Sequence, residues 1–568
     1  MEQGNTESLV PPSVVERMLS VADDLREEAA CREAAWQQCR RYGFQVWDPS
    51  SSTPLDSNTR YVPQQDSLPA QCAWRAAMYL HANTVGVGQT FFRLDVDDAT
   101  RMGLGPESAE LKQLRDLTLP LMREMSTTNF SSVLMSAFND KTVLGTCVGY
   151  VEFNEMTRSL EYSSYQVGKE CYLSSNSRGK PDTFSRTFTL TVKQAVERYG
   201  DRVGPEVLKL ASKPETLKEK IEYVWIVYPR KVFGEKVSKP TDKMPVVPAC
   251  EKPWGHLILD RRNKVAVDVG GYDSFPFASS VWGRLPNSVY GWGPIEMSLS
   301  DVKYLGRLKF KHAEAIDRQV DPAVIVPYSW DGFDSSPGAR NYIEGNGVVR
   351  DMFVQLEPPR VVSDITPQQQ QCLQNIRNNC LLDAFETFDA YTKTMTATEA
   401  RGRVGQSVRA IAPIVHAIHT DFLSVLIKRS LDLLIENGVL GTGLPEGIRR
   451  ENVEIKYVSV LASMVLDGET NKLRDFFANC LEFANSRQAM GDMFDVYFDV
   501  DKVFEHMADF FSIPQDVIRT KTERQKKRKE LEESMMAAQQ QQQEEKILSG
   551  LDPQARSAPG SFAERSGF

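Results

Sequence analysis

The sequence lacks the cysteine spacing of a disulfide-stapled or zinc-bound protein. Its nine cysteines are scattered, and no two of them form a C-x-x-C pair. An odd number of isolated cysteines favours reduced thiols over a disulfide framework or a structural zinc site. We therefore expect the chain to assemble in a reducing, cytosolic compartment.

Long apolar runs and an excess of positive charge are also missing. No apolar stretch approaches the roughly 20 residues of a membrane span, and the start MEQGNTESLVPPS lacks the basic and apolar regions of a signal peptide. We therefore expect no membrane partner. The formal net charge is −9, so the whole protein does not have the basic face with which proteins grip duplex DNA. A weakly acidic protein can still surround DNA without holding it tightly.

Sequence motifs of catalysis and cofactor binding are absent as well. No G-x-x-x-x-G-K-[ST] occurs, which excludes a Walker-type ATPase. The glycines of GTGLPEG, 441–447, follow a predicted helix, which favours a plain loop over a nucleotide site. His416 and His419 lie one helical turn apart near Asp421, but a zinc site needs more ligands, and packed or solvated helix histidines are the simpler interpretation. We expect no catalytic residue, no cofactor and no metal.

The first 290 residues carry a mixed α+β pattern instead. Helical spacing of apolar residues predicts helices at 13–42, 70–85, 108–125 and 191–211. Strand patterns cover 142–153, 185–192, 221–228 and 255–269, and the last is expected to be a hairpin that turns at Arg261-Arg262-Asn263. At 568 residues, the chain is expected to form roughly three or four structural units.

Two long helices then bracket a compact, strand-rich insert. Gly293-Pro294 places proline in the first turn of the first helix, which runs to about Val320. Its narrow apolar stripe consists of Val302, Leu305, Leu308 and Ile316. The second helix has Leu373, Ile376, Cys380, Ala384 and Phe388 on one face. This arrangement predicts a stalk with a small head.

The stretch TKTMTATEARGRVGQ, 392–406, has features of both a phosphate loop and a helix start. A phosphate loop needs a preceding strand and clustered glycines, whereas a predicted helix precedes this stretch. Thr396 and Glu399 have the spacing of a capping box, and the apolar repeat that follows runs to Asn437-Gly438. Pro413 lies inside this repeat and is expected to kink the helix. The stretch is therefore interpreted as a hinge into a long kinked helix.

This order of parts resembles the portal proteins, the head-to-tail connectors of short-tailed bacteriophages. The resemblance is strongest in SVYGWGPIEMSLSDVKYLGRLKFKHAEAIDRQVDPAVIVP and in TMTATEARGRVGQSVRAIAPIVHAIHTDFLSVLIKRSLDLLIENG, and weaker in FSRTFTLTVKQAVERYG. It implies an α+β portal fold with a wing, a two-helix stem, a clip, a tunnel loop and a helical crown. Subunits of this family typically form a dodecameric ring around a central channel.

The resemblance also implies boundaries for these parts. They are an N-terminal wing at 1–293, a first stem helix at 294–321, a clip at 322–366, a second stem helix at 367–387, a tunnel loop at 388–395, a kinked helix with a return to the wing at 396–500, a crown at 501–548 and a disordered tail at 549–568. The glutamine-rich end, with a basic cluster around Lys521 to Lys529, is expected to form the crown's helical surface or to touch nucleic acid.

The function implied is a channel for double-stranded DNA at a single capsid vertex. DNA would enter during genome packaging and leave during ejection, past tunnel-loop residues Lys393, Thr394, Met395 and Thr396. The partners implied are other copies of the chain, the terminase large subunit, the major capsid and scaffolding proteins, and tail adaptor proteins. The protein would be found in the virion and, during assembly, in the host cytoplasm. Two alternatives are a ring-forming tail or scaffold protein without a channel, and an enzyme subunit of the packaging motor.

Overall fold

The computed structural model describes the chain mainly as residues 10–44, 66–85, 90–97, 108–235, 248–320, 362–386, 409–441 and 448–458, with short pieces between them and near residue 530. The chain divides into two compact units, Met1–Glu469 and Thr470–Phe568. This differs from the three or four units expected from length. The fold described below is that of the first unit.

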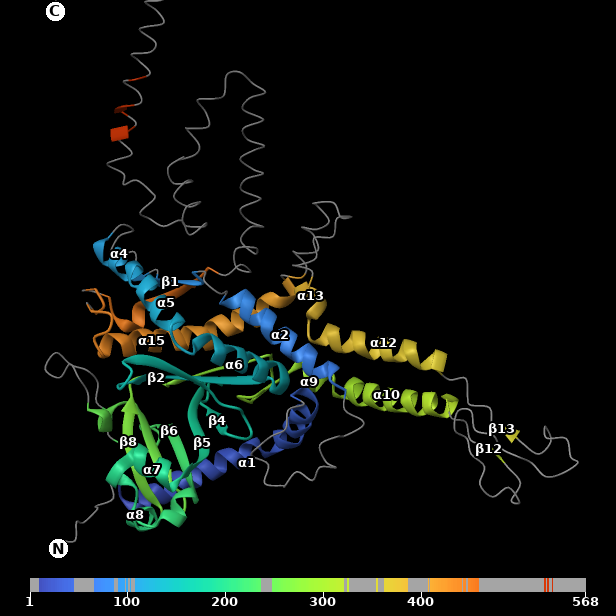
Figure 1. Cartoon of the computed structure of the whole chain (residues 1–568). Helices are drawn as coiled ribbons and strands as arrows, with labels where there is room; N and C mark the ends of the chain where they lie inside the picture. Colours follow the sequence, from blue (N-terminus) through green and yellow to red (C-terminus); the bar gives the residue numbers. More distant parts are fainter. Residues whose placement is uncertain are drawn as a thin grey trace, which may run out of the picture. The chain divides into compact units, whose positions relative to one another are not determined.

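A five-stranded antiparallel sheet forms the centre of one half of this unit (Figure 1). Its strands, in spatial and chain order, are β4 Cys171–Ser175, β5 Pro181–Thr191, β6 Lys220–Pro229, β7 Trp254–Asp260 and β8 Val265–Tyr272. The predicted strands at 185–192 and 221–228 and the hairpin turning after Asp260 are confirmed. The helical stretch expected at 191–211 is broken at Gly200 into α7 Val192–Tyr199 and α8 Pro205–Ala211.

Each face of the five-stranded sheet packs against a different layer. Along β6, Val224 and Ile226 contact helix α1 Pro12–Gly43, which confirms the first predicted helix. The alternating residues Tyr223 and Trp225 face the second sheet. This two-residue alternation places one side chain in each layer because successive residues of a strand point to opposite faces.

The second sheet has three antiparallel strands in the order β3-β2-β9. These are β2 Thr146–Asn154, β3 Ser159–Ser164 and β9 Phe277–Val281. The rings of Phe277 and Phe184 stack with centroids 3.5 Å apart where the two sheets meet. The other face is covered by α6 Phe130–Leu144 and by the helix 409–436. Helix α6 was not predicted, and the strand expected from residue 142 begins only at Thr146 because its first residues complete this helix.

Two further elements close the unit around the long helix. Strand β1 Phe92–Val96 pairs antiparallel with β14 Val453–Tyr457. Helix α2 Leu68–Thr84 is also confirmed. The single helix expected at 108–125 is instead two helices, α4 Ala109–Asp116 and α5 Thr118–Ser126.

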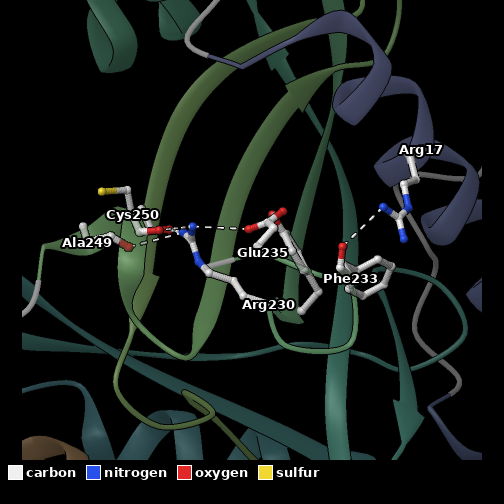
Figure 2. A network of polar contacts seen from close by, with 8 residues as sticks. Arg17, Arg230, Phe233, Glu235, Ala249 and Cys250 are labelled. Carbon is white, nitrogen blue, oxygen red and sulfur yellow. Dashed lines mark hydrogen bonds and ion pairs between the residues drawn. The ribbon is translucent and has the colours of Figure 1, made fainter. Parts of the chain in front are cut away.

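Arg230 ties both ends of the β6–β7 connection to strand β8 (Figure 2). Its guanidinium donates to the carbonyl oxygens of Ala249, Cys250 and Gly270, and it pairs with Glu235 at 3.3 Å. Only 7% of the residue is exposed. A planar fork of five N–H donors suits this convergence of acceptors, and a lysine could not reproduce it.

The helix Arg409–Glu436 is long and apolar enough, by length and composition, to cross a membrane. This differs from the expectation that no stretch approaches a spanning length. Its buried side chains, among them Ile418, Phe422 and Leu426, pack against α6 and β2 in the core. A helix in the core of a globular unit has the same apolar composition, and this packing accounts for it.

Candidate functional site: the two-helix stem and its junction with the body

We refer to α10 Leu299–Val320 and α12 Val362–Asn379 as the stem helices, after the resemblance, and the first of them begins where the sequence predicts. Pro294 occupies the first turn of the short helix α9 Pro294–Met297, after Gly293. Helix α10 Leu299–Val320 follows at once. The break falls at Ser298, whose hydroxyl donates to Pro294 O and accepts from Asn379 Nδ2 at 3.0 Å. Ser298 therefore joins the start of the first stem helix to the end of the second.

The second stem helix, α12 Val362–Asn379, lies beside α10 (Figure 1). It begins before the predicted boundary at residue 367 and contains Pro367 in its second turn, where the proline ring removes one backbone hydrogen bond of the helix. The expected continuation to residue 387 is interrupted because Leu381 adopts a left-handed φ of 55°. The short helix α13 Leu382–Glu386 follows the interruption. Arg377 bridges it by pairing with Asp383 at 3.0 Å and Glu386 at 2.6 Å.

The stem helices share a thin apolar seam with a polar border. Val302, Leu305 and Leu308 are buried, as predicted, and the facing buried residues of α12 include Cys372 and Ile376. Ile316 was predicted to be the last residue of this stripe. The prediction that it is buried is wrong, because 43% of Ile316 is exposed. At the border, Tyr304 Oη donates to Gln368 Oε1 at 2.9 Å, and His312 contacts Gln369 at 3.3 Å.

Aromatic side chains on both flanks of this seam are exposed. Tyr304 is 47% and Phe310 38% exposed. At about 100° per residue, Tyr304 and Phe310 lie on opposite sides of the stripe formed by Val302, Leu305 and Leu308. A helix with apolar side chains on both sides of its buried stripe can bury them against two further helices, one on each side.

The stem helices join the body where two backbone segments cross closely. Gly145, the C-cap of α6, has a φ of +80°. A Cβ there would lie 2.4 Å from Trp292 C, 2.6 Å from Gly291 O and 2.6 Å from Gly293 N. Gly291 N also donates to Thr146 Oγ1 at 2.9 Å. Sequence reasoning missed this crossing, although the glycines on either side of Trp292 were a signal of close backbone approach.

A partly buried ion pair strengthens the same junction. Arg32 of α1 donates to both carboxylate oxygens of Glu296, at 2.8 and 2.6 Å, and to Gly291 O at 3.2 Å. Their side chains are 15% and 19% exposed. A two-pronged arginine–carboxylate pair fixes orientation as well as distance, so α1 sets the direction in which the stem leaves the body. No spacing in the sequence indicated this pair.

Two short strands are the described part of the insert between the stem helices. β12 Val324–Ile325 pairs antiparallel with β13 Val354–Gln355. This agrees with the expected strand content of the insert. The remainder of 322–361 lies outside the described residues.

The predicted channel-facing residues also lie outside the described part of the chain. They are Lys393, Thr394, Met395 and Thr396, together with the cap partner Glu399. Pro413 is described and lies within the helix 409–436. The change in helical hydrogen bonding falls after it, in the π-helical segment Ile418–Leu423. Gly438, with a φ of 67°, ends the helix as predicted.

The two histidines of this helix have different surroundings. Among the described residues, no group of three or more His, Cys, Asp or Glu side chains is placed to hold a metal ion. The buried His419 ring stacks on Tyr457 with centroids 4.0 Å apart, while His416 is exposed. Burial lowers the pKa of His419 to about 4. The packed-histidine interpretation agrees with this geometry.

Comparison with known proteins identifies the family. The family model described as "Bacteriophage head to tail connecting protein" matches residues 15–518. The chain belongs to this family. The probable portal protein of Bordetella phage BPP-1 is 24% identical over 423 residues, which cover 72% of each chain. The portal protein of Salmonella phage epsilon15 is 23% identical over 302 residues, about half of each chain. Portal proteins of this kind are structural virion components at the capsid vertex, where they connect head and tail.

Proposed function

We propose that this connector forms a dodecameric ring whose central channel carries double-stranded DNA into the capsid during packaging and out of it during ejection. In this assignment α10 and α12 are the stem, residues 322–366 are the clip, and 388–395 are the tunnel loop. The clip docks the terminase large subunit and later the tail adaptors. Assembly with capsid and scaffolding proteins takes place in the host cytoplasm. The protein positions DNA and has no catalytic turnover.

The observation that carries the proposal is the stem's exposed aromatic flanks. Tyr304 and Phe310 lie on opposite sides of the seam that α10 shares with α12. A head-to-tail contact repeated around an axis buries one flank against each neighbour, and such contacts close into a ring when the rotation allows it. The net charge of −9 suits a channel through which DNA slides, because tight phosphate contacts would hold it still.

Changing Phe310 to glutamate is expected to weaken ring assembly. An exposed phenyl group that becomes buried at each subunit contact contributes about 1.5–3 kcal/mol, and a carboxylate there would have to be desolvated. Native mass spectrometry across a concentration series should show the variant as smaller species where the unaltered protein forms one large closed assembly. Met156→Glu is the matched control, since Met156 is 97% exposed in the β2–β3 turn. If Phe310→Glu forms an unchanged ring, the side of α10 that carries Phe310 does not lie in the subunit interface.

Changing Lys393 to glutamate is expected to disturb DNA retention without blocking ring assembly. Lys393 is the one cation in the sequence 388–395, so a ring would repeat it once per subunit as a weak belt facing phosphates. Retention of DNA in filled heads, measured by nuclease-protected DNA per particle, should fall. Lys193→Glu on the exposed surface of α7 changes the net charge equally and should leave retention intact. Equal retention in both variants would place Lys393 away from the DNA path.

The rival functions predict different results. A packaging-motor subunit would hydrolyse ATP in the presence of DNA, whereas the purified connector is expected to show no such activity. A tail or scaffold ring without a channel would assemble in the same way but enclose no passage for duplex DNA.

A further inference from the structure

The helix 409–436 contains a wide turn whose carbonyl groups are held by two separate strands. Over Ile418–Leu423 the hydrogen bonding is π-helical, and Ser424 N–H bonds to His419 O, five residues back. A π segment inside an α-helix is rare and costs hydrogen-bond quality. Such a segment persists only where surrounding contacts stabilise it.

Tyr457 of β14 supplies one of these contacts. Its hydroxyl donates to His419 O at 2.9 Å, and the Ser424 hydroxyl donates to the same oxygen at 2.8 Å. The two hydroxyls also lie 2.9 Å apart. One carbonyl oxygen thus receives three donors, counting Ser424 N–H, although it has two lone pairs. The rings of Tyr457 and His419 stack with centroids 4.0 Å apart beside this cluster.

Strand β9 holds the residue just before the wide turn. Ser280 Oγ donates to Ala417 O at 3.3 Å, and the fully buried Lys141 of α6 donates to Ser280 Oγ at 2.7 Å. Burial lowers the pKa of Lys141 to about 8. The two carbonyls that bracket the start of the π segment are therefore bonded from different strands.

We propose that Tyr457 is a positioning residue that fixes the hydrogen-bond register of the long helix. Without its hydroxyl, Ser424 N–H moves from His419 O to Thr420 O and the wide turn becomes an ordinary α turn. The part of the helix before the turn then rotates by about 100° and advances by about 1.5 Å, the step of one residue. Strand β14 and the start of the helix are thereby coupled through one side chain.

The control of helix register by Tyr457, here called the register device, does not depend on a DNA channel. Its effect on DNA rests on the proposed function. If residues 388–395 face DNA, a rotation of the helix that follows them re-aims Lys393. If the register changes and DNA retention does not, the role of Tyr457 is supported and the placement of the tunnel loop is contradicted. If the register does not change, the role of Tyr457 is contradicted and the proposed function is unaffected.

The test compares two tyrosine-to-phenylalanine variants of the full chain. Tyr457→Phe keeps the ring that stacks on His419 and removes only the hydroxyl. Tyr162→Phe is the matched control, because the hydroxyl of the buried Tyr162 bonds Ser430 Oγ at 2.8 Å on the same helix, beyond the π segment. Tyr457→Phe also removes the bond that ties the wide turn to β14, so the turn should open more often. Hydrogen exchange of the peptide that contains Ser424 should therefore accelerate roughly tenfold or more in Tyr457→Phe, the loss of about 1.4 kcal/mol of protection. It should stay unchanged in Tyr162→Phe.

A second variant fixes the structural outcome. Tyr457→Phe combined with Ser424→Ala removes both hydroxyl donors from His419 O. A cryo-EM map of this variant is expected to show Ser424 N–H bonded to Thr420 O and exposed His416 turned toward a new direction. Persistence of the bond from Ser424 N–H to His419 O would overturn the proposal, as would equal acceleration of exchange in Tyr162→Phe. Should the double variant fail to fold, the exchange comparison of the two single variants still decides.

Discussion

Replacing Gly145 by alanine is expected to prevent the connector from accumulating as a folded protein. Its φ of +80° alone costs a residue with a side chain about 1–2 kcal/mol. The added methyl group would also meet backbone atoms of Gly291, Trp292 and Gly293 at 2.4 to 2.6 Å. Backbone at a crossing cannot step aside as a flexible side chain can, so the total cost should exceed about 4 kcal/mol, a large share of typical stability.

Gly179→Ala provides the control for this prediction. Gly179 has a similar φ of +72°, but nothing lies within 4 Å of an added Cβ. Its alanine variant should lose only about 1 kcal/mol and remain soluble. The soluble yield and the thermal unfolding midpoint, measured for both variants, distinguish Gly145→Ala from Gly179→Ala. Equal losses would show that the left-handed conformation, and not the close approach of the stem, dominates at Gly145.

Replacing Arg230 by methionine is expected to destabilise the five-stranded sheet and its β6–β7 connection by about 3 kcal/mol. The side chain is nearly buried and donates to three carbonyl groups, so its removal takes a charged donor away from each of them. Hydrogen bonds from a charged donor contribute about 1.5–3 kcal/mol. Arg230→Lys should recover only part of the loss because one ammonium group cannot reach all of these acceptors.

Arg17→Met is the matched control for Arg230. Figure 2 shows that Arg17 also donates to a carbonyl of this connection, Phe233 O, but it does so from an exposed position at 3.5 Å. Its loss should cost less than about 1 kcal/mol. Urea unfolding midpoints give both values. A loss for Arg230→Met no larger than that of Arg17→Met would show that the network does not hold the connection.

The sequence predicts those elements whose apolar spacing is regular. Correct predictions were made where the spacing of apolar residues and the residues that begin or end an element agree. They include the strands at 185–192 and 221–228, the helix at 13–42 and the helix start at Gly293-Pro294. Helix α6 was missed because it is buried by α2 on one side and β2 on another, so its apolar residues do not form a single stripe. Ile316 was placed in the core because its spacing fits the stripe of α10, and spacing does not report where the partner helix ends.

The junction and the register device depend on contacts between distant parts of the chain. Arg32 and Glu296 are 264 residues apart, and Tyr457 and His419 are 38 apart. A single sequence contains no periodic signal for such pairs. Pro413 was expected to kink the long helix. The π segment, which no sequence feature predicted, lies at Ile418–Leu423, where hydroxyl donors from other elements meet its carbonyls. Local composition therefore located the helix but not its wide turn.

The most direct test of the proposed portal channel is a cryo-EM reconstruction of the purified full-length protein. The proposal predicts a closed ring with an axial passage wide enough for duplex DNA, α10 and α12 around that passage, and Lys393 facing it. A monomer at every concentration, a ring without an open axis, or Lys393 on the outer surface would contradict it.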